Sequence, residues 1–369
     1  QEAMSVRFRR LLSQDPNGIP PWLEAVASGD EPGLYLPTDA PWVVHADFGT
    51  LVGGIRALLM QALHPGTLRG VAQHSRYKED PLGRLAGTIR WLTVTTFGSH
   101  TAVANEASRV NRLHTKVTGS YQVTPDVTRD YKAADPDLLL WVHIAFMDSF
   151  LTCHQMYAWR PIPGGADNYI SQWSKSVEPL GLTGVPMTKA ALVETIDDYL
   201  QRGLLRVDDS TRDVVKFIQY PPLPGVSKYV YRLLFQAAVL SLEPEFRVML
   251  GLKAAPRWLI QPTTRFVLRT IRFLIGPESA IEDSAVARLK RQPDGKAEAL
   301  FYDSIVRGAG LQAGLQKALD EALARLPIPK VMQYQLETDC ELPGWSSVNF
   351  VRPAHRLVAL HGSAVLPVK

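Results

Sequence analysis

The chain has 369 residues, of which 46% are hydrophobic and 21% are charged. This length allows two domains or one large helical domain, and the composition is that of a folded globular protein, which excludes a disordered or fibrous one. Forty basic and 36 acidic residues give a net charge of +4. A dedicated nucleic-acid binder has a more one-sided balance, so we expect no nucleic-acid partner.

The two cysteines, Cys153 and Cys340, lie far apart and form no C-x-x-C pair. This spacing excludes a zinc ribbon, a thioredoxin motif and haem attached through C-x-x-C-H. We expect a reducing, cytoplasmic environment. The first ten residues contain basic side chains without an apolar run behind them, and no stretch reaches the ~18 apolar residues of a spanning helix. We therefore expect neither a secretory signal nor a membrane span.

Apolar residues recur mainly at helical spacing, which predicts a mainly α-helical chain. Prolines, glycines and capping residues place helices at 51–63, 82–97, 101–117, 135–157, 188–203 and from 209 or 210 to the prolines at 221 and 222. A loop is expected at 120–134, and further helices as far as 326. The predicted organisation is an N-terminal extension with the first helices at 1–39, a single large helical domain at 40–326 and an irregular, extended tail at 327–369 that packs on the domain.

A basic amphipathic helix is expected between 256 and 275. Arg265, Arg269 and Arg272 fall on one helical face. Apolar bulk comes from Trp258, Leu259, Phe266, Leu268, Phe273 and Leu274. Such a helix can lie on an anionic membrane surface, which would give a peripheral membrane contact. The alternative is an ordinary surface helix whose arginines are solvated or paired.

Two histidines are predicted to point inward on consecutive helices. His114 continues the apolar stripe of Val103, Ala107, Val110 and Val117. His143 shares a helical face with Leu139 and Phe150. A buried imidazole without a partner costs roughly 1–3 kcal/mol, so each is either a satisfied core histidine or a ligand of haem iron or of a non-haem metal.

The helix at 82–97 aligns Arg84, Thr88, Trp91 and Thr95 along one side. An arginine and two threonines on an inward face need polar partners. Haem would provide them, because guanidinium groups pair with propionates and a hydroxyl can donate to bound oxygen.

A non-haem iron site would need a carboxylate beside the histidines. Asp148 lies about 140° round the helix from His143, which disfavours a shared metal. His64 and His74, which flank the turn that begins at His64-Pro65, are either caps of helix ends or members of a histidine metal cluster.

Several of these residues stand in motifs that resemble a large bacterial helical family. The motifs are Leu58 to Pro65, Gly70 to Ser75, Asp80 to Leu85 with Thr88, Phe97-Gly98, Arg109 to His114, Asp135 to His143 and Asp148-Ser149. The family includes the rubber oxygenases of the latex-clearing-protein type and the membrane-bound oxygenase of mycophenolic acid biosynthesis. The resemblance covers about residues 40–280, and its ordered series of motifs is more specific than any single motif.

The resemblance implies a helical protein that holds haem b and has an oxygen-dependent activity; members studied as enzymes cleave isoprenoid carbon–carbon double bonds. By motif, His114 is the proximal iron ligand, and Arg84 and Thr88 line the haem pocket. The basic residue that rubber oxygenases place just before this threonine, a distal ligand in their closed state, is Gly87 here. No residue matches the glutamate proposed as their base, so rubber is a poor guess for the substrate.

The predicted oxidoreductase would hold a small or medium hydrophobic substrate beside dioxygen. Asn111 would orient the second ring nitrogen of His114, and Arg109 would join Arg84 at the propionates. Thr88 or His143 would donate a hydrogen bond to oxygen. The aromatic wall would come from Trp91, Trp141 and Phe146.

Two alternatives from other classes are a haem sensor or carrier without turnover, and a helical protein that binds a non-haem metal or a lipid.

Overall fold

The computed structural model describes residues 22–74, 81–124, 127–223, 225, 227–275 and 280–290, and short pieces at 316–317, 320–321, 332–335, 347–350, 359–361 and 364–366. Cys340 and the side chains of His74, Arg84 and Leu274 lie outside the described residues. The chain divides into two compact units, Gln1–Ala299 and Leu300–Lys369, and each is described by itself.

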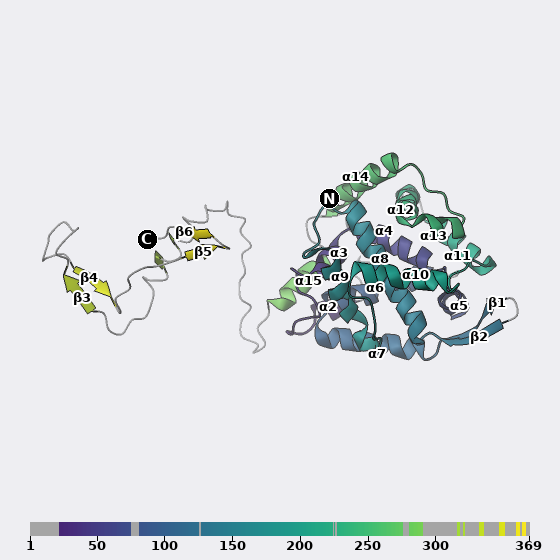
Figure 1. Ribbon diagram of the computed structural model, residues 1–369, viewed down its shortest axis with the longest axis horizontal. Helices are drawn as coiled ribbons and strands as arrows, with labels where there is room; N and C mark the ends of the chain where they lie inside the picture. The colour runs from purple at the N-terminus through teal and green to yellow at the C-terminus, as the bar shows by residue number, and fades with distance from the viewer. Residues whose placement is uncertain are drawn as a thin grey trace. The chain divides into compact units, whose positions relative to one another are not determined.

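The first unit is built almost entirely of helices, which confirms the predicted mainly α fold (Figure 1). The helices are α2 (Leu23–Ala27), α3 (Ala40–Ala46), α4 (Gly49–Gln61), α5 (Pro65–His74), α6 (Pro81–Phe97), α7 (His100–His114), α8 (Pro136–Tyr157), α9 (Gly165–Trp173), the 3₁₀ helix η1 (Ser174–Leu180), α10 (Lys189–Gln201), α11 (Asp209–Gln219), α12 (Ser227–Ser241), α13 (Pro244–Met249), α14 (Arg257–Ile275) and α15 (Ala280–Leu289).

Helix starts follow the local capping signals. The hydroxyl of Ser99 accepts from an amide in the first turn of α7, and that of Thr188 does the same for α10. Asp208 and Thr211 form a reciprocal capping box at α11. Asp135 precedes α8 as predicted, but its carboxylate accepts from the amide of Lys132 at 2.9 Å instead of from a helix amide.

The core lies around α8, which packs against α4, while α4 also packs against α12. Leu59, Ile144 and Leu151 are among the fully buried side chains of this core. A Cβ atom on Gly53 would lie 2.7 Å from the Phe150 ring and 3.3 Å from the Phe150 Cα. Glycine at this position therefore lets α4 and α8 approach closely, which sets the position of every side chain on α8.

The expected loop at 120–134 is wrong. Strand β1 (Thr118–Thr124) pairs antiparallel with β2 (Val127–Lys132), and β1 packs against α5. Tyr121 and Tyr131 are buried, whereas the described β2 residues other than Tyr131 are exposed. Tyrosine, valine and threonine suit a half-buried strand, but one buried ring in each short strand makes too little alternation to distinguish a hairpin from a loop.

The described strands of the second unit form two antiparallel pairs. Strand β3 (Met332–Gln335) pairs with β4 (Ser347–Phe350), and β5 (Ala359–His361) pairs with β6 (Ala364–Leu366). This agrees with an extended rather than a helical segment after residue 327.

Within the described part of the chain, no single helix has the length and apolar character to cross a membrane, although α3 and α4, bent by 93°, meet that test when taken as a pair.

Candidate functional site

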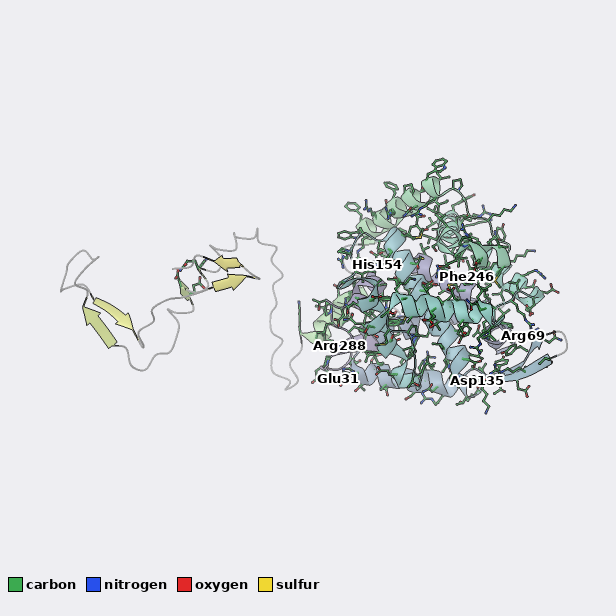
Figure 2. All side chains as sticks on the ribbon, viewed as in Figure 1. Glu31, Arg69, Asp135, His154, Phe246 and Arg288 are labelled. Atoms are coloured by element: carbon green, nitrogen blue, oxygen red, sulfur yellow. The ribbon has the colours of Figure 1, made fainter. Side chains whose placement is uncertain are left out.

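Helices α6, α7 and α8 carry the residues that the sequence singled out. Thr88 is half-buried on α6, and Asn111 and His114 are half-buried in the last part of α7. His143 is buried on α8. Figure 2 draws the side chains of the described residues on the ribbon.

One face of α8 is directed toward α3. His143, Phe146 and Phe150 are spaced three and four residues apart and therefore share this face. The ring of Phe150 meets the ring of His45 on α3 edge to face, with centroids 5.2 Å apart. His45 Nδ1 lies 2.8 Å from the hydroxyl of Thr96 on α6, and its Nε2 lies 3.0 Å from the hydroxyl of Tyr169. His143 thus lies on the side of α8 that faces α3.

Two further polar atoms, one on α8 and one on α6, are buried without a hydrogen-bond partner among the described residues. They are the Nε2 atom of His143 on α8 and the hydroxyl oxygen of Thr95 on α6. Burial lowers the pKa of His143 to about 3, so its imidazole is neutral near pH 7. A neutral imidazole can donate or accept one hydrogen bond at Nε2, according to its tautomer. Both groups are therefore available to a ligand.

On α6, the position of Gly87 is uncrowded by the described residues. A Cβ atom added to Gly87 would meet no atom within 4 Å, and both Thr88 and Trp91 are half-buried. A side chain at position 87, which the resembling rubber oxygenases fill with a basic residue, would have room. Glycine leaves this space unfilled.

Glu106 joins α6 to α7 through two arginines. It is buried, and its carboxylate lies 2.8 Å from Arg90 Nε on α6 and 3.0 Å from Arg109 Nε on α7. Burial by itself would raise the pKa of Glu106, but hydrogen bonds from Arg109 and Arg90 hold it below its usual value. Arg109 thus pairs with Glu106, and its predicted role at a propionate stays a prediction. The sequence signal for Glu106 is an acidic residue on the buried side of α7 with an arginine one turn later.

Trp141 lies on a different side of α8 from His143. The two residues are about 160° apart around the helix. The ring of Trp141 packs against Tyr199 with centroids 5.0 Å apart and against His64 at 6.4 Å. The structure therefore separates Trp141 from the face that carries His143, contrary to the predicted aromatic wall.

Asp148 is committed to an ion-pair network. Its carboxylate lies 2.6 Å from Arg56 and 2.6 Å from Lys189. Burial alone would raise the pKa of Asp148, but these two cations hold it below its usual value. Asp148 therefore has no free oxygen to offer to a metal beside His143, and the described residues contain no group of three or more His, Cys, Asp or Glu placed to hold one.

His64 caps α5, as one reading of the sequence predicted. Its Nδ1 accepts a hydrogen bond from the amide of Gly66 at 3.1 Å. Burial is the main reason that the pKa of His64 is lowered to about 4, so this histidine is neutral near pH 7. Neutral Nδ1 is the form that can accept from the helix amide.

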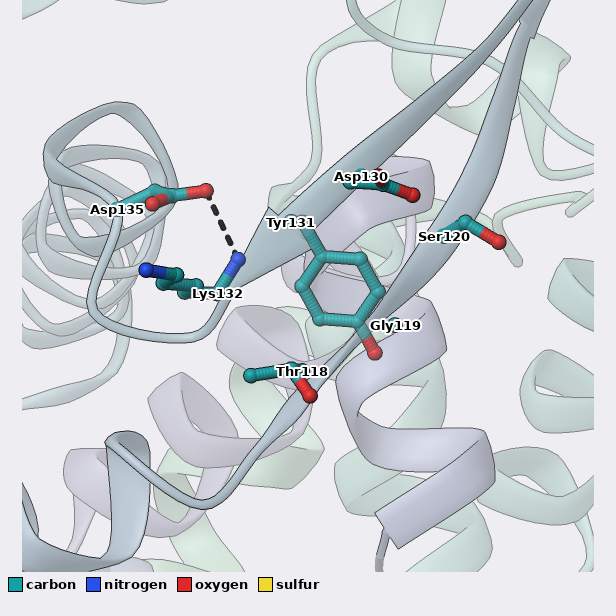
Figure 3. Close-up of a pocket in the computed structure, with 7 residues that line it drawn as sticks. All are labelled: Thr118, Gly119, Ser120, Asp130, Tyr131, Lys132 and Asp135. Atoms are coloured by element: carbon teal, nitrogen blue, oxygen red, sulfur yellow. Dashed lines mark hydrogen bonds between the residues drawn. The ribbon is translucent and has the colours of Figure 1, made fainter.

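A surface pocket of about 540 Å³ lies between the β1–β2 hairpin and the start of α8 (Figure 3). Its lining residues are Thr118, Gly119, Ser120, Asp130, Tyr131, Lys132 and Asp135. None of the predicted site residues lines it. The groups on α6, α7 and α8 remain the candidate site.

Residues 42–273 match the family described as the catalytic domain of the ER-bound oxygenases mpaB and mpaB′ and of rubber oxygenase. The chain belongs to this family. The matched region runs from α3 into α14 and contains every predicted site residue. Membership of this family supports an oxygenase, and hence an oxidoreductase, as the class of function. No solved structure matches it.

Residues 278–369 match a second family, the beta subunit of glycyl-tRNA synthetase. The glycine–tRNA ligase beta subunit of Polaromonas naphthalenivorans is 74% identical over 95 residues, which are 26% of this chain and 13% of the ligase subunit. The corresponding subunit of Paracidovorax citrulli is 72% identical over 83 residues, which are 22% of this chain and 12% of that protein. The chain thus spans about an eighth of the length of these relatives. The division predicted at residue 326 falls inside this second matched region.

Proposed function

We propose that this chain is a haem b-dependent oxygenase or oxidase that acts on a small or medium hydrophobic molecule. The observation that carries the proposal is membership of the oxygenase family over residues 42–273. The proposal does not use the second matched region, because that region corresponds to only a small part of the ligase subunits that it resembles.

The side chains on α6, α7 and α8 fit such a group. The unpartnered Nε2 of His143 and hydroxyl of Thr95 are buried polar atoms that need a ligand, and the space beside Gly87 is open. His114 would hold the iron and Arg84 would pair with a propionate. When bound, haem b would supply a redox-active iron centre for chemistry with dioxygen.

The chain's own residues would orient the reactants. Thr88 and the neutral imidazole of His143 would each donate a hydrogen bond toward dioxygen. Asn111, one turn before His114, would accept from its second ring nitrogen and so fix the ring orientation. Glu106, by tying Arg90 to Arg109, keeps α6 and α7 together and thereby sets the spacing between Thr88 and His114. Phe146, whose ring meets that of Phe150 edge to face, would contribute apolar surface that excludes water.

The test is the absorption spectrum of the purified protein, first ferric, then reduced with dithionite, then exposed to carbon monoxide. We expect a Soret band that shifts with carbon monoxide. His114→Ala should lose or displace this band, whereas His100→Ala, at an exposed position on the same helix, should keep it. Absence of a Soret band in the wild type after haem reconstitution would overturn the haem assignment.

Turnover is tested separately with an oxygen electrode and unsaturated hydrophobic compounds of graded size. Oxygen consumption that depends on both the compound and the haem would support an oxygenase. A protein that binds haem and carbon monoxide but consumes no oxygen with any compound would instead be a sensor or carrier.

A further inference from the structure

The outward face of α14 is aromatic. Trp258, Pro262, Phe266, Arg269 and Phe273 are spaced four, four, three and four residues apart, so they lie within about 80° of the helix circumference. Trp258 and Phe273 are each 77% exposed and Phe266 is 71% exposed. Ring side chains project from α14 at the top of the view in Figure 2.

The opposite face of α14 attaches the helix to the protein. Ile260, Thr264 and Leu268 are buried, and Ile260 and Leu268 belong to the main hydrophobic core. The helix therefore has two apolar faces, and the core uses only one of them. Large aromatic side chains that are exposed together on one element usually mark an interaction surface.

Two of the three arginines predicted to form a basic face turn toward the protein instead. Arg265 Nε donates to the carbonyl of Met156 at 2.8 Å, and Arg272 Nη1 donates to the carbonyl of Ala46 at 3.2 Å. Arg269 remains exposed, between the aromatic side chains. The predicted basic stripe is thus wrong in its detail, and the exposed stripe is aromatic with one arginine in it.

The chain segment that contains this stripe is rich in basic residues. Residues 246–276 contain no aspartate or glutamate. They contain the basic residues Arg247, Lys253, Arg257, Arg265, Arg269 and Arg272. A second copy of the chain docked through the same face would place like charges opposite one another, which disfavours a symmetric dimer. An anionic surface complements both the charge and the aromatic rings.

We propose that the outward face of α14 docks on an anionic lipid bilayer. The helix would lie in the plane of the membrane, with Trp258, Phe266 and Phe273 at the boundary between headgroups and acyl chains. Arg269 would face the lipid phosphates, and each such cation strengthens binding to an anionic leaflet. This inference rests on α14 alone and does not depend on haem or on the proposed reaction.

The experiment is flotation of the full chain with vesicles of phosphatidylcholine, with and without phosphatidylglycerol. We expect binding that requires phosphatidylglycerol. The triple variant Trp258→Ser, Phe266→Ser, Phe273→Ser should bind at least about tenfold more weakly, and Arg269→Gln about fivefold more weakly. The matched control is Leu36→Ser, Met187→Ser, Val193→Ser, which removes three exposed apolar side chains outside α14 and should bind like the wild type.

Circular dichroism verifies that each variant is folded, which is expected because all the replaced side chains are exposed. A wild-type chain that floats with neither vesicle would overturn the proposal, as would a folded triple variant that binds as tightly as the wild type. Sedimentation velocity without lipid supplies a further arm. A dimer that the triple variant abolishes, without vesicle binding, would show that a second copy covers this face.

Discussion

Two regions of helix α8 with buried polar side chains differ in whether these side chains have partners. Toward α4 and α12, Asp148 pairs with Arg56, whose guanidinium also reaches Glu243 at 2.9 Å and the hydroxyl of Ser149 at 2.8 Å. On the face toward α3, His143 Nε2 has no hydrogen-bond partner among the described residues, and neither has the hydroxyl of Thr95 on α6. Ion pairs hold the buried charges of the first region, whereas the two polar atoms of the second have no partner within the described part of the chain.

This difference separates a structural network from a candidate site. Burial works against the charge on Arg56, yet Asp148 and Glu243 raise its pKa above its usual value, so the network stays ionised and holds three helices together. An unsatisfied buried polar atom costs roughly 1–3 kcal/mol unless something else bonds to it. Such a cost is tolerated where a ligand supplies the missing partner, which is why the unsatisfied region is the one that we assign to function.

The largest expected effect comes from breaking the satisfied network. Asp148→Asn leaves Arg56, whose side chain is fully buried, without its nearest carboxylate, and should lower the free energy of unfolding by about 3–5 kcal/mol. Urea titration followed by far-ultraviolet circular dichroism measures it. Asp209→Asn removes an ion pair whose partners are both exposed and should leave the midpoint unchanged. Equal effects of the two variants would contradict a structural role for the network.

A smaller loss is expected at the contact between α6 and α7. Glu106→Gln removes the charge that accepts from Arg90 and Arg109, and should cost about 2 kcal/mol. The same urea titration measures it, with Glu194→Gln at an exposed position of α10 as the control. Because the pair of helices carries Thr88 and His114, we also expect the Soret band of haem-loaded Glu106→Gln to broaden or shift. A stable variant with an unaltered spectrum would remove Glu106 from the site.

The pH dependence of stability distinguishes His143 from exposed histidines. The unfolded chain protonates this histidine below about pH 6.5, whereas the folded chain keeps it neutral down to about pH 3. The contribution of His143 to the free energy of unfolding is therefore complete above pH 6.5, and it is lost as the pH falls toward 3. Between pH 7 and pH 5, the loss is about 2 kcal/mol.

Between pH 7 and pH 5, we expect His143→Leu to lose about 2 kcal/mol less stability than the wild type. Urea titration at both pH values measures the difference. His100→Leu, at an exposed position, should keep the wild-type dependence. Identical pH profiles for the wild type and His143→Leu would show that His143 is not buried in its neutral form.

The smallest effect comes from two neighbouring threonines that are both fully buried. Thr96 lies 2.8 Å from His45 Nδ1, so Thr96→Val should cost about 1 kcal/mol. Thr95→Val removes a hydroxyl without a partner and should leave stability unchanged or slightly higher. Thermal unfolding of the pair measures the difference. A Thr95→Val variant as unstable as Thr96→Val would mean that the Thr95 hydroxyl has a partner within the fold.

Local signals in the sequence determined most of the helices. The cap at Ser99, the cap at Thr188 and the Asp135-Pro136 pair act within four residues of the chain, so they can be recognised without any tertiary contact. Helical periodicity likewise predicted that His143 points inward. The β1–β2 hairpin was missed because each strand buries one tyrosine among its described side chains, and that burial arises from packing beside α5 and against Leu138.

The tertiary structure alone decided which polar groups are satisfied. The residues that bond one another are far apart in the chain: Arg56 and Glu243 are separated by 187 positions, and His45 and Tyr169 by 124. For the same reason, periodicity placed Arg265, Arg269 and Arg272 on one face of α14, but only contacts with Met156 and Ala46 turned two of them inward and left the aromatic face outward. A side chain's neighbours in space decide whether its polar atoms are paired, and one-dimensional spacing does not contain those neighbours.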